Sequence, residues 1–238
     1  MTKREAVMSI LRREDPGRVV YAPNYWQWFA HQSNHGMLPD EISHCTEQLD
    51  LINYLGLYVF SRNTYSDQQE YWFGGLTERV FDGVEVEKDV HTKGRDIVTT
   101  LRYRTPKGSL EERLRYIFSD STIVQEKHLV DDPSTQLDIF EDLLSRIRYR
   151  FLPDRYDREV ERIGENGLPM AGEFFSPLKL LHIYLGPVET TYQLTDREER
   201  LEPILAMHEE RQLDLLRQMM DHGVRGAISM DNLDAMFH

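Results

Sequence analysis

Acidic side chains follow two of the short apolar segments of this sequence. Glu173 stands at the end of segment 168–172, and Asp231 stands at the end of segment 226–230. Two carboxylates at the ends of neighbouring strands suit a general acid/base pair or a pair of metal ligands. A carboxylate that caps the next helix is almost as ordinary a role for Asp231. The sequence therefore offers both acids as catalytic candidates, with a helix cap as the alternative for Asp231.

Further candidates follow the other apolar segments, 18–22 and 57–60. Arg62, just after segment 57–60, is the third catalytic candidate. Aromatic rings with a few polar groups suit a flat or aromatic ligand, and a place in the core or against a partner is the alternative for Trp26. The candidate substrate-binding residues are Asn24, Tyr25, Trp26, Asn63, Phe175 and Asn232.

Helical patterns separate these four apolar segments, which we predict to be buried strands. Thr2 and Glu5 form a capping-box pattern, and Asp132 precedes Pro133 as an N-cap. Thr46 is expected to cap a helix that ends at Gly56, and Pro203 is expected to begin another. Strands that alternate with helices predict right-handed βαβ units and a parallel sheet, whose carboxyl ends would gather the candidates at one rim.

Residues 80–126 follow a different pattern. Apolar residues alternate with polar ones on both sides of the turn at Lys93-Gly94. This alternation predicts an antiparallel piece with one face in water, inserted into a single α/β domain that spans 1–238.

Two closures of the parallel sheet compete. A doubly wound sheet that binds a dinucleotide needs a glycine-rich turn after its first strand, but Pro23-Asn24-Tyr25-Trp26 stands there. We therefore favour a (β/α)₈ barrel of the TIM type, with the antiparallel hairpin sheet inserted.

Composition excludes several functions. The chain has 28 Lys and Arg against 41 Asp and Glu, a net charge of −13. This acidity argues against binding to nucleic acid or to an anionic membrane. No apolar run is long enough for a membrane span, and no signal peptide is visible. The single Cys45 excludes an internal disulfide and a cysteine-rich zinc site. We expect a cytoplasmic protein.

Several motifs occur in an order that resembles the uroporphyrinogen decarboxylase superfamily, which includes corrinoid-dependent methyltransferases. The motifs are Thr-Lys-Arg-Glu-Ala-Val at 2–7, Leu-Arg-Arg-Glu-Asp-Pro-Gly-Arg-Val-Val at 11–20, Thr-Pro-Lys-Gly-Ser-Leu at 105–110, Glu-Lys-His-Leu-Val-Asp-Asp-Pro at 126–133 and Met-Met-Asp-His-Gly-Val-Arg-Gly-Ala-Ile-Ser-Met-Asp at 219–231. The resemblance covers the whole chain, and the order of the motifs is more specific than any one of them.

The resemblance implies an eight-stranded barrel, of which this chain holds about the first four strands. It would then be a fragment, or a half barrel that pairs with another copy through its open strand edges. An isolated half barrel could be inactive as an enzyme.

Two departures separate the chain from the decarboxylase branch of the family. That branch carries an arginine-rich loop after strand one and an Asp after Phe-Ser at strand two. Here Tyr25-Trp26-Gln27-Trp28 and Arg62 stand in those places. The resemblance therefore implies a methyltransferase-like enzyme, which moves a methyl group between a small methylated substrate and a corrinoid. The alternatives are uroporphyrinogen decarboxylase, a carboxy-lyase of porphyrin biosynthesis, and a non-catalytic binding or assembly module.

No cofactor site is visible in the sequence itself. Zinc and a corrinoid, the latter on a partner protein, are what the resemblance implies for an intact family member. His31 and His35 have the spacing of a two-histidine metal clip, but Ser33, Asn34 and Gly36 argue against a helix there. We therefore assign no metal ligand.

Overall fold

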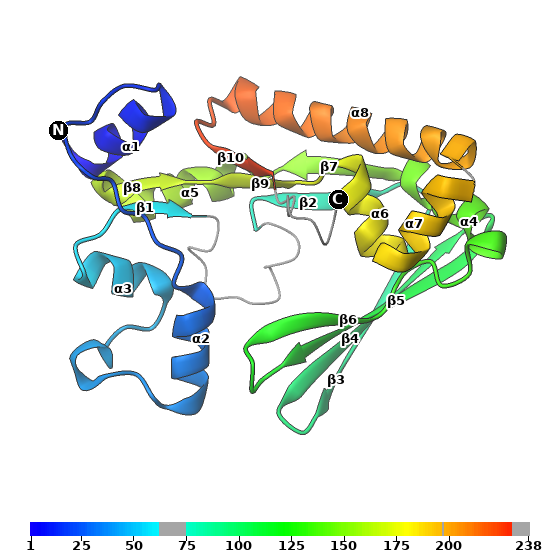
Figure 1. The fold of residues 1–238 in the computed structure, drawn as a ribbon, viewed down its shortest axis with the longest axis horizontal. Helices are drawn as coiled ribbons and strands as arrows, with labels where there is room; N and C mark the ends of the chain where they lie inside the picture. The colour runs from blue at the N-terminus through cyan, green and yellow to red at the C-terminus, as the bar shows by residue number, and fades with distance from the viewer. Residues whose placement is uncertain (62–74, 197, 230–238) are drawn as a thin grey trace. The chain divides into compact units, whose positions relative to one another are not determined.

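The computed structural model describes residues 1–61, 75–196 and 198–229, and it confirms the mixed α/β class (Figure 1). The chain forms two compact units. Unit 1 comprises the described parts of Met1–Glu78, Phe151–Glu173 and Arg217–Ile228. Unit 2 comprises the described parts of Arg79–Arg150, Phe174–Leu216 and Ser229–His238.

Unit 1 begins with a helix that the sequence predicts. Thr2 and Glu5 form the expected capping box at the start of α1. The Arg4 guanidinium donates to the carbonyls of Val160 and Gly167, which ties the helix to the rest of the unit. The helical elements of unit 1 up to residue 163 are α1 (Lys3–Leu11), α2 (Trp26–His35), the 3₁₀ turn η1 (Asp40–Ile42), α3 (Gln48–Tyr54) and α5 (Pro153–Ile163).

A short parallel strand pair lies in unit 1. Strand β1 (Val59–Ser61) pairs with β8 (Gly167–Pro169), which follows the 3₁₀ turn η3 (Gly164–Asn166). Val59 is fully buried beside Leu49, Ile52 and Ile163. A side chain at Gly167 would overlap the Val59 carbonyl, so this pairing requires glycine.

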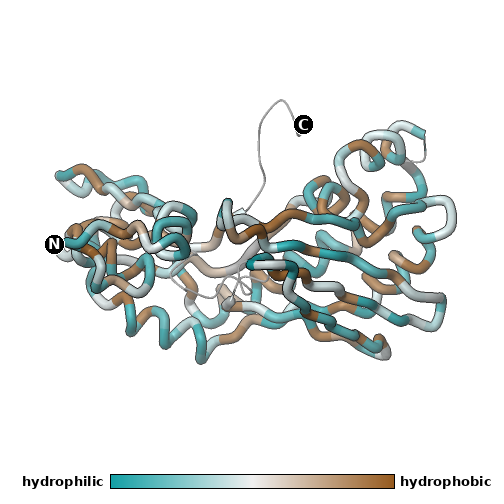
Figure 2. Tube along the Cα trace, turned by 90° about the horizontal axis from the view of Figure 1, so that it is seen from below, coloured by the Kyte–Doolittle hydropathy of each residue, from teal (hydrophilic) through white to brown (hydrophobic). Residues whose placement is uncertain are grey.

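Unit 2 contains a four-stranded antiparallel sheet in the order β3-β4-β5-β6. Hydrophobic and hydrophilic residues alternate along these strands (Figure 2). Pro106 and Lys107 form the turn between β4 and β5, so the Thr-Pro-Lys-Gly motif is a hairpin turn here. The strands are β3 (Glu85–Lys93), β4 (Asp96–Thr105), β5 (Gly108–Ile117) and β6 (Thr122–Lys127).

Helices cover the buried part of this sheet. The Asp132 carboxylate accepts the Ser134 amide at 3.1 Å, which confirms the predicted N-cap of α4. Helix α4 packs on β4 and β5 (Figure 1), and its Phe140 joins Leu110, Leu181 and Ile204 in one core. The helices are α4 (Pro133–Ser145), α6 (Pro177–Leu185), α7 (Pro187–Asp196) and α8 (Glu198–His222).

Two further strand pairs complete the described structure. Strand β2 (Thr77–Phe81) pairs with β7 (Ile147–Phe151), and β9 (Ala171–Phe174) pairs with β10 (Ala227–Ser229). The strands predicted at 57–60, 168–172 and 226–230 therefore exist. Segment 57–60 contributes to β1, segment 168–172 is divided between β8 and β9, and segment 226–230 contributes to β10. Within residues 1–61, 75–196 and 198–229 the strands do not close into a barrel.

The strand predicted at 18–22 is wrong. The segment has no strand geometry, and Val19 and Tyr21 are 87% and 55% exposed. A single backbone hydrogen bond joins it to the next segment, from the Tyr58 amide to the Tyr21 carbonyl at 3.3 Å. The exposure of Val19 shows that the apolar character of segment 18–22 was not enough to bury it.

Three predicted helix boundaries also require correction. Pro203 lies inside α8, where burial of Leu201 and Ile204 outweighs the backbone hydrogen bond that proline cannot make. Glu47, not Thr46, is the N-cap of α3. The spacing of Thr195 and Glu198 predicts a further capping box, but Thr195 lies within α7 and donates to the Thr191 carbonyl. No described helix has both the length and the apolar character needed to cross a membrane.

Candidate functional site

The predicted aromatic segment begins helix α2. The Asn24 side chain accepts the Trp26 amide at 3.1 Å and so organises the first turn. Gly36 ends the helix with a φ of 63°, in the left-handed region that favours glycine. This helix buries Trp26 and Phe29, whereas Trp28 is 41% exposed.

The connection that follows α2 returns the chain to pack against it. Phe29, Ile42, Cys45 and Leu51 form a small core, and Tyr25 packs on it. Burial raises the pKa of the Cys45 thiol, so this side chain belongs to the packing and is a poor nucleophile. The core fixes α2, η1 and α3 relative to one another within unit 1.

A cavity of about 570 Å³ opens above this core. Three aromatic rings line it, two of them well exposed: Trp28 at 41% and Tyr54 at 52%. Its volume lies in the range of small-molecule sites. Exposed aromatic rings around a cavity are typical of a binding surface. The lining residues are Tyr25, Trp28, Pro39, Glu41, Ile42, Leu51, Tyr54 and Leu55; we call this cavity the aromatic pocket.

The rings of the aromatic pocket are held by their neighbours. Tyr25 meets Trp28 edge to face, with 6.2 Å between the ring centroids. A hydrogen bond with Tyr21, together with burial, raises the pKa of the Tyr25 phenol, so the ring is neutral at physiological pH. The His44 ring meets Tyr54 in a similar edge-to-face contact at 5.2 Å.

One carboxylate supplies the charge of the aromatic pocket. Glu41 is exposed, and no hydrogen bond or ion pair joins it to another residue in the described ranges. By contrast, Asp50 on α3 accepts hydrogen bonds from Thr46 and Glu47. Burial raises the pKa of Asp50, but these hydrogen bonds outweigh it and the pKa is lowered. Glu41 is therefore the acid that remains available to a ligand here.

The structure places the predicted site residues in different parts of the fold. Of Asn24, Tyr25 and Trp26, only Tyr25 lines the aromatic pocket; Asn24 organises the helix start and Trp26 is buried. Phe175 lies in unit 2, where its amide donates to Gln212 and its carbonyl lies 3.0 Å from His208 Nε2.

Glu173 lies in β9, and the structure describes its backbone alone. Arg62, Asn63, Asp231 and Asn232 lie outside the described residues. The structure therefore does not bring the three catalytic candidates together into a described site.

A second polar cluster lies inside unit 2, where the sequence suggested none. The Arg79 guanidinium donates to the Tyr184 hydroxyl at 3.2 Å and to the Tyr103 hydroxyl at 3.3 Å. Tyr103 in turn donates to the buried Glu112 carboxylate at 2.8 Å. Burial lowers the pKa of Arg79, but these neighbours outweigh burial and raise it, so the guanidinium stays charged. The cluster joins β2, β4, β5 and α6, and its donors are used internally.

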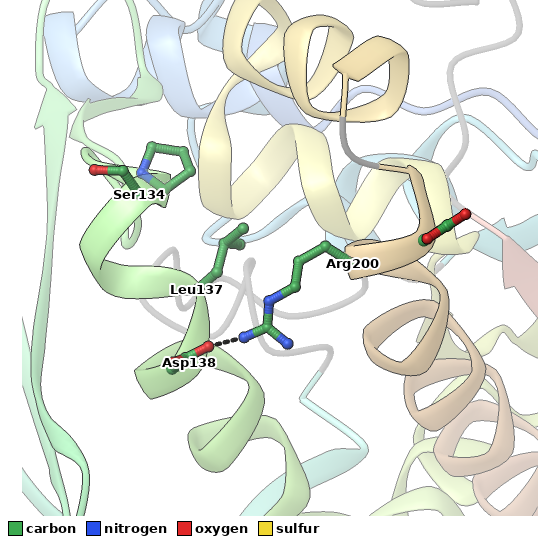
Figure 3. Close-up of a pocket in the computed structure, with 6 residues that line it drawn as sticks. Ser134, Leu137, Asp138 and Arg200 are labelled. Carbon is green, nitrogen blue, oxygen red and sulfur yellow. Dashed lines mark ion pairs between the residues drawn. The ribbon is translucent and has the colours of Figure 1, made fainter.

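A further hollow of about 490 Å³ lies between α4 and α8. Arg200 reaches from α8 to Asp138 on α4 (Figure 3) and also pairs with Glu141 at 3.1 Å. Two carboxylates thus satisfy Arg200, the one cation among the described residues that line this hollow, which leaves little charge there to recognise a ligand.

Metal ligands do not assemble in the part of the chain that the structure describes. His31 and His35 do share a helix, contrary to the expectation, and their ring centroids are 4.3 Å apart. Over residues 1–61, 75–196 and 198–229, however, no group of three or more His, Cys, Asp or Glu side chains could hold an ion. Zinc sites usually have three or more protein ligands, and the described residues supply no third ligand to this pair.

Sequence reasoning missed Glu41, Tyr54 and the Arg79 cluster. Glu41 and Tyr54 do not follow a predicted apolar strand, so candidates chosen at the ends of strands do not include them. The signal for the Arg79 cluster was weak but present, because Tyr103 shares its parity with buried Leu101 on β4. No family model, curated protein or solved structure matches the chain.

Proposed function

We propose that this chain is a methyltransferase-like member of the uroporphyrinogen decarboxylase superfamily that binds a small methylated molecule in the aromatic pocket. The order of the motifs from residue 2 to residue 231 supports this membership. The parallel pairing of β1 with β8 is the pairing that a barrel of this kind requires, so we also propose that these strands belong to a partial (β/α)₈ barrel.

The character of the aromatic pocket carries the proposal. Its surface is almost wholly apolar, and the described residues that line it include Glu41 but no Lys, Arg or His. A tetrapyrrole with several carboxylates needs cations to hold it, and here it would meet a carboxylate instead. This observation favours methyl transfer over porphyrinogen decarboxylation.

The groups that the family implies find no site among the described residues. Zinc would need three or four protein ligands, which the described side chains do not gather. A cavity of about 570 Å³ suits a drug-sized molecule. The described residues would bind and orient the methylated molecule. A corrinoid would come with a partner protein.

The test is a demethylation assay on the chain itself. The protein is incubated with N-, O- and S-methylated small molecules and a reduced corrinoid as methyl acceptor, and mass spectrometry follows the loss of one methyl group. We expect loss that depends on the protein and is about five-fold slower in Trp28→Leu, since removing one aromatic contact costs about 1 kcal/mol. Tyr192→Leu, which alters an exposed ring on α7, is the matched control.

Other outcomes identify the alternatives. Loss of carbon dioxide from a polycarboxylated porphyrinogen, with no methyl loss, would assign the decarboxylase function instead. Absence of both reactions, with a stable homodimer in sedimentation, would favour the assembly module.

A further inference from the structure

The aromatic pocket combines two features that a neutral ligand would not need. Its rings come from both walls, Tyr25 and Trp28 from the start of α2 and Tyr54 from α3. Among the described residues that line it, Glu41 carries the charge. Aromatic faces attract cations through the ring quadrupole, and quaternary ammonium groups are recognised by such sets of rings.

We propose that the aromatic pocket selects a methylated ammonium group, held against the faces of Tyr25, Trp28 and Tyr54 and balanced by Glu41. This proposal rests on the proposed function and names its substrate class, an N-methylated small molecule. A methylated ammonium is large, weakly hydrated and cationic, so it loses little hydration on entering an apolar cavity. A compact ammonium or a carboxylate would lose far more.

The packing of the pocket supports a preformed site. Tyr25 is anchored by the core of Phe29, Ile42, Cys45 and Leu51, and it fixes Trp28 by an edge-to-face contact. Glu41 sits in η1, which carries the buried Ile42. Little side-chain ordering is therefore required when the ligand binds.

The charge of the surroundings agrees with a cationic ligand. Other acids near the pocket are engaged by the protein: Asp50 by Thr46 and Glu47, and Glu47 by Arg162. No Lys or Arg among residues 1–61, 75–196 and 198–229 lines the cavity to compete for Glu41. The ligand cation would thus meet the one lining carboxylate that is not already paired.

The test compares choline and tetramethylammonium with the neutral carbon isostere of choline. Binding is followed by NMR through the indole N–H signals of the whole chain, with Trp28 assigned from Trp28→Phe. We expect millimolar binding of both cations, with a Kd about five-fold lower than that of the isostere. The Trp28 signal should shift, and that of buried Trp26 should shift less.

Matched variants separate the contribution of the Glu41 charge from that of the aromatic rings. Glu41→Gln keeps the shape of the side chain and should weaken cation binding about five-fold without changing the isostere. Tyr54→Leu should weaken it about three-fold, and Trp28→Phe, which keeps an aromatic face, should weaken it less than Trp28→Leu. Glu202→Gln and Tyr192→Leu change exposed residues of unit 2 and should leave binding unchanged. Circular dichroism of each variant checks its fold.

Two results would overturn the proposal. If the cations and the isostere bind equally, and Glu41→Gln does not change their Kd values, the pocket does not select for charge. A neutral methylated substrate would then be the better candidate. No binding by any of the three probes, or a pocket covered by a second copy in sedimentation, would remove the ligand class altogether. Neither result decides the proposed methyl transfer, which the demethylation assay tests separately.

Discussion

Removing the guanidinium of Arg79 should destabilise unit 2 far more than removing an exposed arginine. The charged group donates to the Tyr103 and Tyr184 hydroxyls, at 3.3 and 3.2 Å, and lies 5.7 Å from the centroid of the Phe81 ring. Hydrogen bonds from a charged donor contribute about 1.5–3 kcal/mol each. Arg79→Met also removes a positive charge that interacts with the buried Glu112 carboxylate. We expect a loss of about 3–5 kcal/mol in the free energy of unfolding.

The matched control is Arg102→Met on strand β4. Arg102 is 46% exposed and pairs at the surface with Glu111 at 2.7 Å. Exposed ion pairs contribute about 0–1 kcal/mol, so this variant should unfold almost as the parent does.

Urea unfolding with two optical probes measures the difference. Trp26 and Trp28 lie in unit 1, so their emission reports on that unit, whereas the near-ultraviolet circular dichroism of the tyrosines includes unit 2. In Arg79→Met the tyrosine signal should be lost at a lower urea concentration. If Arg79→Met and Arg102→Met unfold within about 1 kcal/mol of each other by both probes, the cluster does not stabilise unit 2 and the reasoning is refuted.

Three other perturbations test other parts of the structure. Gly167→Ala should lower the free energy of unfolding by about 3 kcal/mol or more, because the new methyl group would overlap the Val59 carbonyl. The control Gly94→Ala, in an open turn, should lower it by about 1 kcal/mol. Equal losses in urea unfolding would contradict the β1–β8 pairing. Burial raises the pKa of Tyr103, Tyr149 and Tyr184, so the folded state holds these protons more tightly than the unfolded state. Stability should therefore be complete below about pH 10 and fall as pH rises through the raised pKa values, and stability that stays constant while tyrosinate absorbance grows would contradict this. Cys45 should react with a disulfide reagent much more slowly than a free thiol at neutral pH, because burial restricts access and raises its pKa; a rate equal to that of glutathione would show that it is accessible.

Local patterns predicted helix starts well where side-chain geometry alone decides them. The capping box at Thr2 and Glu5 and the Asp132 N-cap followed by Pro133 are both as the sequence indicated. These signals involve residues within three positions of each other, so the fold around them adds little.

Predictions failed where burial decides the outcome. Val19 and Tyr21 resembled a buried strand but face water, and Pro203 resembled a helix start but lies within α8. Hydrophobic periodicity indicates which residues can be buried. Whether they are buried depends on segments from distant parts of the chain that pack against them.

The candidate site was predicted only in part. Tyr25 was found because an aromatic after an apolar run suggests a ligand site, although the strand expected before it is absent. Glu41 and Tyr54 were missed because they line the aromatic pocket only after η1 and α3 pack against α2. The residues that complete a pocket depend on that packing, and no motif records it.

Nuclear Overhauser contacts between the methyl protons of bound tetramethylammonium and the protein locate the ligand most directly. We expect contacts to the ring protons of Tyr25, Trp28 and Tyr54, and weaker contacts in Glu41→Gln at the same ligand concentration. Contacts confined to other residues, or unchanged contacts in that variant, would contradict the account of the aromatic pocket as a site for methylated ammonium compounds.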